Sequence, residues 1–325
     1  MPLDPQVVGL LQRRTEAGAL PVELLGLAGA RAVFTQSVWA VGAELAGVEE
    51  LLIPGPAGPI ESRLYRPTAE PGLPVVVFLH GGGWALGDIA TYDALCRDIA
   101  VAAGCVVLAV NFRRAPEDPF PAGFEDALAA TAWTYQQADT LRVDGNRLIL
   151  LGDSAGGNLA AAVSTAARDL VSFPVAAQIL VYPPTDRADS SDSMSLFSTG
   201  YLLHAATIDW FWDQYLSRPA DRDNPYACPL RTPDFGRLPR TLLITAEYDP
   251  VRDQAEAYGA ALRAAGNDVT ISRYAGVVHG FFQMPTLIDR GREALAELAS
   301  FIGRTTGQNR PVAGSPEPPP AVEER

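Results

Sequence analysis

The sequence predicts an α/β fold built on a mostly parallel sheet of eight strands. From about residue 48 onward, strand-like apolar runs alternate with helix-like segments, which is the order typical of a parallel sheet covered by helices. The later runs are apolar throughout, as expected when helices cover both faces of a sheet. The expected strands lie at 48–53, 60–65, 75–79, 105–110, 148–152, 176–182, 241–245 and 269–274.

The first two expected strands are joined by a turn-rich segment from Pro54 to Pro59. A connection this short suits a hairpin, because parallel neighbours need a longer crossover. We therefore expect one strand of this pair to run antiparallel to the rest. Further along, the small-residue stretch 157–163 follows the strand at 148–152 and is expected to form a helix.

Two regions do not take part in the alternation. Residues 1–45 carry helical patterning, and residues 187–232 combine a polar loop with an aromatic helix at 208–216. We expect both to form a helical cap over the core. An aromatic stripe at helical spacing is typical of a buried core as well as of a substrate pocket, so the role of residues 210–212 stays open here.

These features predict how the chain is divided. The last segment is polar and rich in proline, and we expect it to be disordered. The predicted parts are N-terminal cap helices at 1–45, a first part of the core at 46–186, a cap insertion at 187–232, a second part of the core at 233–304 and a tail at 305–325.

Composition narrows the classes of partner. The chain has 325 residues, of which 48% are hydrophobic and 19% charged, and its net charge is −13. Nucleic acids and anionic membranes are bound by surfaces with excess basic charge, so neither a nucleic-acid partner nor stable membrane association is expected. A small-molecule partner is expected instead, and a homodimer stays open.

Cysteine and histidine usage argues against a disulfide framework and a metal site. The three cysteines have no Cys-x-x-Cys spacing, and the three histidines, His80, His204 and His279, are widely spaced. We expect neither a metal nor another cofactor. The N-terminus lacks the basic and apolar regions of a signal peptide, which predicts a cytoplasmic location.

A glycine run follows the expected strand at 75–79, in the segment His80-Gly81-Gly82-Gly83-Trp84. Without side chains in the way, the backbone N–H groups of such a loop can point at a developing oxyanion. A phosphate-binding loop would require a lysine after the glycines, and the chain contains no lysine.

Ser154 lies in the pattern Gly152-Asp-Ser154-Ala-Gly156, between the expected strand at 148–152 and the expected helix at 157–163. The pattern alone carries little weight in a glycine-rich chain. Its strand–turn–helix context is what a nucleophile elbow requires, so Ser154 is the expected nucleophile.

Together these motifs resemble the bacterial hormone-sensitive-lipase-like esterases, an α/β-hydrolase family with a helical cap. The resemblance implies that Ser154 is the nucleophile, His279 the general base and acid, and Asp249 the carboxylate that orients the imidazole. It also implies that His80 holds the glycine loop. The matching segments are His80-Gly-Gly-Gly-Trp-Ala-Leu-Gly87, Arg114-Ala-Pro-Glu117, Phe120-Pro-Ala122, Gly152-Asp-Ser-Ala-Gly-Gly157, Ala246-Glu-Tyr-Asp-Pro-Val-Arg-Asp253 and His279-Gly-Phe281.

The order serine, acid, histidine agrees with this assignment, because α/β-hydrolases place their triad in that order. Asp253 competes with Asp249 as the acid, since it lies four residues later. We favour Asp249, which closes a strand, and expect Asp253 to begin a helix, where a carboxylate complements the helix dipole. The expected oxyanion donors are the backbone N–H groups of Gly82, Gly83 and Ala155.

The predicted function is a serine carboxylesterase that hydrolyses small esters with short to medium acyl chains through an acyl-enzyme. Amidase, lactonase or peptidase activity is the alternative, since the same groups serve several acyl transfers. A non-catalytic ligand-binding relative is a further alternative. The expected substrate wall consists of Phe34, Trp39, Trp84, Trp210 and Val278.

Overall fold

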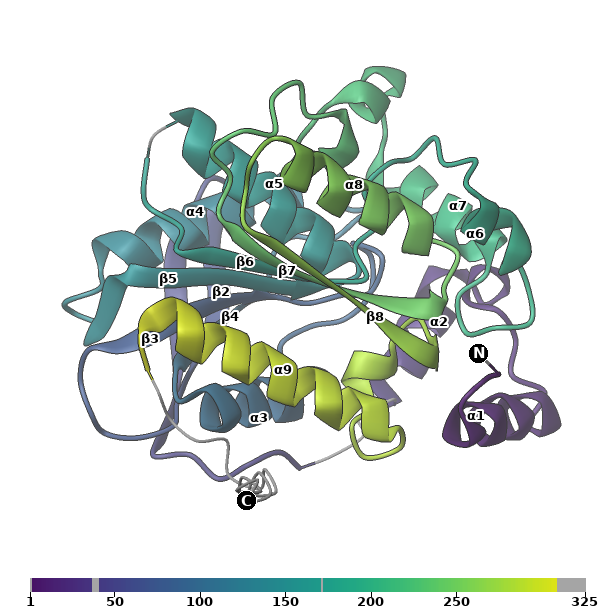
Figure 1. Cartoon of the computed structure of the whole chain (residues 1–325), viewed down its shortest axis with the longest axis horizontal. Helices are drawn as coiled ribbons and strands as arrows, with labels where there is room; N and C mark the ends of the chain where they lie inside the picture. Colours follow the sequence, from purple (N-terminus) through teal and green to yellow (C-terminus); the bar gives the residue numbers. More distant parts are fainter. Residues whose placement is uncertain (1, 37–40, 171, 309–325) are drawn as a thin grey trace, which may run out of the picture.

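The computed structural model describes residues 2–36, 41–170 and 172–308 and has the predicted α/β architecture (Figure 1). Its single sheet has eight strands in the order β1-β2-β4-β3-β5-β6-β7-β8. The strands are β1 Gly47–Gly55, β2 Gly58–Arg66, β3 Leu73–Leu79, β4 Val106–Val110, β5 Val143–Asp153, β6 Ala177–Val181, β7 Arg240–Tyr248 and β8 Val269–Val278.

Strand directions follow from the lengths of the connections. β1 and β2 form an antiparallel hairpin, and β2 is also antiparallel to β4. All other neighbours are parallel. The antiparallel strand expected within the first pair is therefore β2. β5 is longer than predicted because Val143 and Asp144 pair with β3 ahead of a register shift.

Helices cover both faces of the sheet, which explains the apolar strands. In β3, Val75, Val77 and Leu79 face one core cluster, whereas Val76 and Phe78 face the other. This is the alternation that a pleated strand imposes. Figure 1 shows α4 (Ala122–Gln136), α5 (Ala155–Leu170) and α8 (Arg252–Ala264) on one face, and α3 (Asp93–Ala103) and α9 (Asp289–Thr306) on the other.

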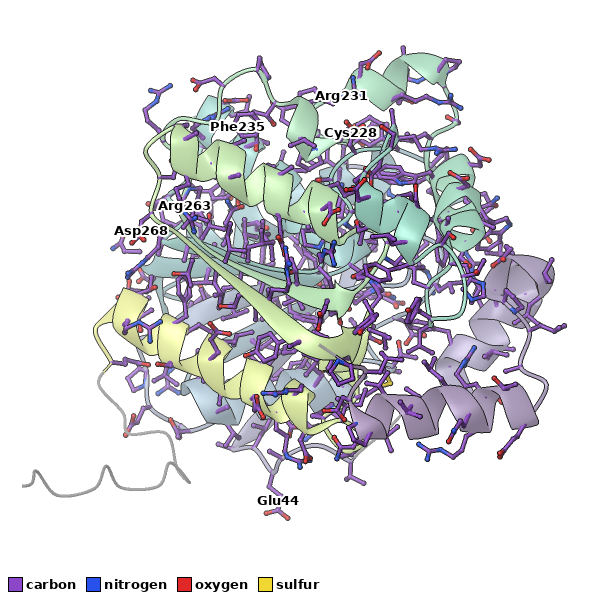
Figure 2. The ribbon with its side chains drawn as sticks, turned by 45° about the vertical axis from the view of Figure 1, so that its right-hand side comes forward. Glu44, Cys228, Arg231, Phe235, Arg263 and Asp268 are labelled. Carbon is purple, nitrogen blue, oxygen red and sulfur yellow. The ribbon has the colours of Figure 1, made fainter. Side chains whose placement is uncertain are left out.

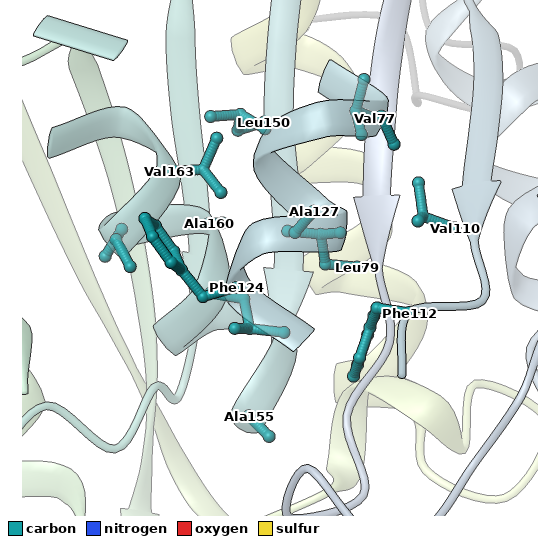
Figure 3. Packing of buried hydrophobic residues seen from close by; sticks show 14 of the residues in the cluster. Val77, Leu79, Val110, Phe112, Phe124, Ala127, Leu150, Ala155, Ala160 and Val163 are labelled. Carbon is teal, nitrogen blue, oxygen red and sulfur yellow. The ribbon is translucent and has the colours of Figure 1, made fainter. Parts of the chain in front are cut away.

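Small residues let helices approach the sheet closely on the first face. Ala160 and Val163 of α5 are buried against Leu150 of β5, and Phe124 of α4 fills the space beside them (Figure 3). Burial of this kind stabilises the fold by about 25 cal/mol per Å² of apolar surface. The packed helix α5 begins at Ala155, directly after the expected nucleophile.

The cap comes from the two regions outside the alternation. At the N-terminus it consists of α1 (Pro5–Glu16), η1 (Val22–Leu24) and α2 (Gly26–Gln36). The insertion contributes α6 (Asp192–Leu196), α7 (Ala205–Tyr215), η2 (Pro219–Asp223) and η3 (Pro229–Arg231). Figure 1 shows α2, α6 and α7 beyond the arrowheads of the last strands, and Figure 2 shows Cys228 and Arg231 of the insertion beside α8.

At the C-terminal end, α9 continues to Thr306 and so enters the segment predicted as a tail. Residues 309–325, the remainder of that predicted tail, lie outside the described residues. None of the described helices is long and apolar enough to cross a membrane. The predicted domain boundaries stay a prediction.

Candidate active site

The turn between β5 and α5 holds Ser154 in a strained conformation. Its φ is 51°, in the left-handed region that residues other than glycine rarely adopt. The neighbouring glycines make the turn possible, because a Cβ on Gly152 would collide with the carbonyl of Gly156. A Cβ on Gly156 would likewise collide with the carbonyl of Leu79. The serine hydroxyl is thereby presented at the carboxyl end of the sheet.

The ends of two further strands place Asp249 and His279 beside this serine. Asp249 follows β7 directly, and His279 follows β8. The distance from His279 Nδ1 to Asp249 Oδ2 is 2.7 Å, and that from His279 Nε2 to Ser154 Oγ is 2.9 Å. The other carboxylate oxygen of Asp249 accepts a hydrogen bond from the Val251 backbone N–H at 3.0 Å. Asp249 is fully buried, and its two hydrogen bonds hold the carboxyl group in place against the imidazole.

Asp253, the competing acid, lies elsewhere. It sits in the first turn of α8, where its carboxylate accepts hydrogen bonds from the Ser193 backbone N–H at 2.9 Å and from Arg252 at 2.8 Å. The geometry therefore brings Asp249, not Asp253, to the imidazole of His279. The position of Asp253 in the first helical turn agrees with the prediction.

The three expected oxyanion donors lie around Ser154. Gly82 and Gly83 have φ values of 107° and 59°, and the Leu86 backbone N–H closes their turn by donating to the Gly82 carbonyl at 2.8 Å. Ala155 is the first residue of α5, where helix N–H groups lack helical partners. No described residue accepts a hydrogen bond from the backbone N–H of Gly82, Gly83 or Ala155. These donors are available to a bound oxygen.

The buried carboxyl group of Asp153 links the glycine loop to the segment that follows His279. Asp153 accepts hydrogen bonds from the Gly81 backbone N–H at 2.9 Å, Gln283 Nε2 at 2.6 Å and Tyr92 Oη at 3.2 Å. Burial raises the pKa of Asp153 to about 6, although these three donors act in the opposite direction. The sequence analysis missed this role. The position of Asp153 beside the nucleophile was a usable signal, whereas nothing in the sequence indicated Gln283 or Tyr92.

His80 is buried next to the same loop and does not reach the serine. Its Nδ1–H donates to the Gly81 carbonyl at 2.8 Å, and its ring stacks on Phe112 at a centroid distance of 4.3 Å. Burial lowers the pKa of His80 to about 4, so the ring is neutral near pH 7. This geometry fits a role in holding the loop.

A cavity of about 200 Å³ opens onto Ser154 and His279, and both cap segments help to line it. Most of its lining is apolar. The cap contributes Val22, Phe34, Leu202, Leu203, Thr207, Ile208, Phe211 and Trp212, and the core contributes Gly82, Gly83, Trp84, Leu86, Ser154, Pro184, Val251, His279, Gly280, Gln283 and Met284.

The cavity brings together only some residues of the expected substrate wall, which stays a prediction. Phe34 and Trp84 line the cavity, whereas Trp210 and Val278 do not, and Trp39 lies outside the described residues. Trp210 projects from α7 at a different angle from its cavity-lining neighbours and packs beside Phe211. Val278 ends β8 and points into the core under the sheet. The sequence analysis did not identify Leu202 or Leu203, which come from the loop before α7.

No group of three or more acidic, histidine or cysteine side chains suited to a metal is found among the residues that the model places. The groups gathered around Ser154 are a hydroxyl, an imidazole, a carboxyl group and backbone N–H donors. This set is the one that acyl transfer through a serine requires.

Comparison with known proteins agrees with this geometry. A family model described as alpha/beta hydrolase fold matches residues 76–283. The chain is 44% identical to the carboxylic ester hydrolase LipN of Mycobacterium tuberculosis, over 78% of this chain and 69% of that protein. It is 35% identical to an ethyl acetate hydrolase of Pseudomonas putida, over 93% of this chain and 99% of that protein.

A solved structure extends the match. The hyperthermophilic esterase of the archaeon Pyrobaculum calidifontis superimposes with a TM-score of 0.90 at 38% identity, covering 94% of this chain and 99% of that one. The chain belongs to the α/β-hydrolase family. Within it, the chain is a carboxylic ester hydrolase, as the resemblance implied.

Proposed function

We propose that the chain hydrolyses short- to medium-chain esters through an acyl-enzyme formed on Ser154. The observation that carries this proposal is the hydrogen-bonded series Asp249–His279–Ser154, with distances of 2.7 Å and 2.9 Å. Ser154 and His279 line an apolar cavity together with Gly82 and Gly83, whose backbone N–H groups are two of the expected oxyanion donors.

In the first half of the reaction, Ser154 Oγ attacks the ester carbonyl carbon while His279 Nε2 accepts the hydroxyl proton. The carbonyl oxygen becomes an oxyanion, which accepts hydrogen bonds from the backbone N–H groups of Gly82, Gly83 and Ala155. Asp249 stabilises the imidazolium. The bond to the alcohol oxygen then breaks, and the alcohol leaves with the proton held by His279.

In the second half, water attacks the acyl carbon of the Ser154 ester and gives its proton to His279. The same three N–H groups stabilise the second oxyanion. Collapse of this intermediate releases the carboxylic acid, and the proton on His279 returns to Ser154 Oγ. Atoms and charge balance over the cycle, and the net reaction consumes one water.

Cavity size supports the acyl range. A volume of about 200 Å³ is smaller than the 300–1,000 Å³ typical of pockets for drug-sized ligands. Each buried methylene contributes only about 0.8 kcal/mol, so preference should rise with acyl length and stop when the cavity is full. A series of aryl esters of increasing acyl length, run beside aryl amides, lactones and peptides, measures both the range and the reaction class.

The nucleophile is tested by Ser154→Ala, with Ser164→Ala as the matched control. We expect Ser154→Ala to lower kcat by on the order of 10⁶ in a folded protein. Ser164 lies on α5, is buried, and has a hydroxyl without a hydrogen-bond partner among the described residues, so its variant should retain activity. An organophosphonate should label Ser154 alone. Normal turnover by Ser154→Ala would refute the proposal.

An ester is the partner that this proposal requires. A cytoplasmic location belongs to the same proposal, and it is compatible with the three cysteines, which are buried and unpaired. A homodimer also stays a prediction, and sedimentation of the purified chain measures it directly.

A further inference from the structure

Arg31, on the N-terminal cap helix α2, reaches into the core beside the glycine loop, which with Ala85 and Leu86 forms residues 80–86 and is called the oxyanion loop from here on. Its Nε donates to the Ala85 carbonyl at 2.9 Å, and its Nη2 donates to the Ala115 carbonyl at 3.2 Å. The same guanidinium forms a bidentate pair with Glu117, at 2.7 Å and 2.8 Å. One cap side chain therefore contacts two loops of the core at once.

Both carbonyls belong to the structure that shapes the oxyanion loop. Ala85 lies in the same turn as Gly82, since its backbone N–H donates to the Gly82 carbonyl at 3.2 Å. Ala115 holds the loop from the other side, because its backbone N–H donates to the Trp84 carbonyl at 2.9 Å. Arg31 thus binds a turn whose Gly82 and Gly83 line the cavity that contains Ser154.

This turn contains a strained residue. Trp84 has a φ of 58°, and a large side chain in this region costs of order 1–3 kcal/mol, so it persists only where its surroundings hold it. Hydrogen bonds from a charged donor are stronger than those from neutral donors. Arg31 supplies such bonds to Ala85, which follows Trp84, and to Ala115, which binds the Trp84 carbonyl.

Apolar packing joins the cap to the same turn. Ala30, one residue before Arg31, is buried in a cluster with Ala85 and Leu86. On the cavity side, the ring of Phe211 from α7 lies so close to Gly83 that a Cβ there would collide with it. The oxyanion loop is therefore enclosed between the two cap segments and the core.

We propose that Arg31 is a positioning residue for the reaction, which couples docking of the N-terminal cap to the geometry of the oxyanion loop. The cap then contributes to stabilisation of the transition state as well as to the substrate wall. This inference rests on the proposed function, because it takes Gly82 and Gly83 as the oxyanion donors.

The test uses two substitutions at one position in the full chain. Arg31→Met keeps an unbranched apolar stem and removes every donor, whereas Arg31→Lys keeps the charge but cannot span both carbonyls and Glu117. Arg187→Met is the matched control. Arg187 is a cap arginine paired with Asp209 at 2.6 Å, and no contact joins it to the oxyanion loop among the described residues.

We expect Arg31→Met to lower kcat by about 10- to 100-fold, less than the 10²- to 10³-fold cost of removing an oxyanion donor outright. The loss should be equal for acetyl and hexanoyl aryl esters, with KM unchanged. Inactivation by an organophosphonate, whose phosphoryl oxygen takes the oxyanion position, should slow by the same factor. Arg31→Lys should recover part of both rates, and Arg187→Met should match the parent.

Two results would overturn the inference. One is a folded Arg31→Met with the parent kcat and inactivation rate. The other is a change confined to KM that grows with acyl length, which would make Arg31 a determinant of the substrate wall. If Arg31→Met does not fold, Arg31→Lys is judged by the same criteria. Failure of the proposed function is distinct, since it would appear as turnover by Ser154→Ala.

Discussion

The core and the cap hold the oxyanion loop by different physical means. From the core, Asp153 is fully buried and accepts hydrogen bonds from three neutral donors. From the cap, Arg31 binds backbone carbonyls and pairs with Glu117, whose side chain is 54% exposed. The first contact is shielded from solvent ions and depends on pH, whereas the second is accessible to salt and independent of pH near neutrality.

Exposure to solvent decides how much each of these two contacts contributes to stability and how much to the geometry of the loop. Burial disfavours the ionised form of Asp153, so this side chain contributes more to the geometry of the oxyanion loop than to stability. The exposed pair of Arg31 and Glu117 costs little to form and adds little to stability. The contribution of this pair also lies in geometry, because the guanidinium of Arg31 positions the oxyanion loop.

The largest effect is expected at the core acid. Asp249→Asn should lower kcat by on the order of 10⁴, because an amide cannot hold the imidazole in the required tautomer. Asp253→Asn, four residues further along the chain, is the matched control and should leave kcat near that of the parent. Steady-state kinetics of both variants decide the assignment, and the reverse ranking would show that Asp253 is the acid.

The next effect is a pH-dependent change in stability at Asp153. Folding raises the pKa of its carboxyl from 3.8 to about 6, so the folded state retains the proton in the window between these values. The stability that Asp153 contributes is thus present below 3.8 and is lost as the pH rises through about 6, by about 3 kcal/mol.

Asp153→Asn cannot ionise and should not show this loss. Relative to the parent, its free energy of unfolding should improve by about 3 kcal/mol between about pH 4 and pH 7. Denaturant titrations at several pH values measure the difference in the free energy of unfolding between variant and parent. The contributions of other titrating groups are common to both proteins and cancel in this difference. A difference that stays constant over this range would show that the core contact does not depend on pH.

A smaller effect is expected where the cap meets substrate. Phe34→Ala should enlarge the cavity, so kcat/KM should continue to rise beyond the acyl length at which the parent levels off. The gain should be about fourfold per methylene, corresponding to about 0.8 kcal/mol. Leu24→Ala, at a cap residue that is 66% exposed, is the control. An unchanged acyl-length profile in Phe34→Ala would exclude Phe34 from the substrate wall.

The smallest effect concerns the exposed ion pair. Glu117→Gln should lower the free energy of unfolding by about 0–1 kcal/mol, and the difference should shrink at high salt. Arg31 lowers the pKa of Glu117 from 4.5 to about 2, so this contribution is present above pH 4.5 and lost as the pH falls through 2. Denaturant unfolding at low and high salt measures the contribution of the ion pair. A salt-independent loss of several kcal/mol would show that the pair is not a weak, solvent-exposed contact.

The core could be predicted well because the sequence signals for its strands and turns are local. Apolar runs of strand length located all eight strands, and the short connection before Pro59 identified the hairpin. The motifs around Ser154, Asp249 and His279, together with their order along the chain, indicated the three groups that the fold places together. Each of these follows the end of a strand, so a correct strand assignment places it at the same edge of the sheet.

The cap was less predictable because its contacts join distant segments. Helical periodicity indicated an aromatic helix, but it did not give the rotation of α7, which turns Phe211 and Trp212 toward the cavity and Trp210 away from it. Arg31 carries no local signal at all, since its acceptors lie more than fifty positions along the chain. Gln283 meets Asp153 only through the tertiary fold.

The shared lining of the cavity has a consequence for directed evolution of this enzyme. The reacting groups come from the core, whereas Val22, Leu202, Leu203 and Ile208 come from the cap and line the cavity without belonging to the triad. We expect a combinatorial library at these four positions to yield variants with altered selectivity and intact turnover. A library that included Gly83 or Trp84 should consist mostly of inactive clones.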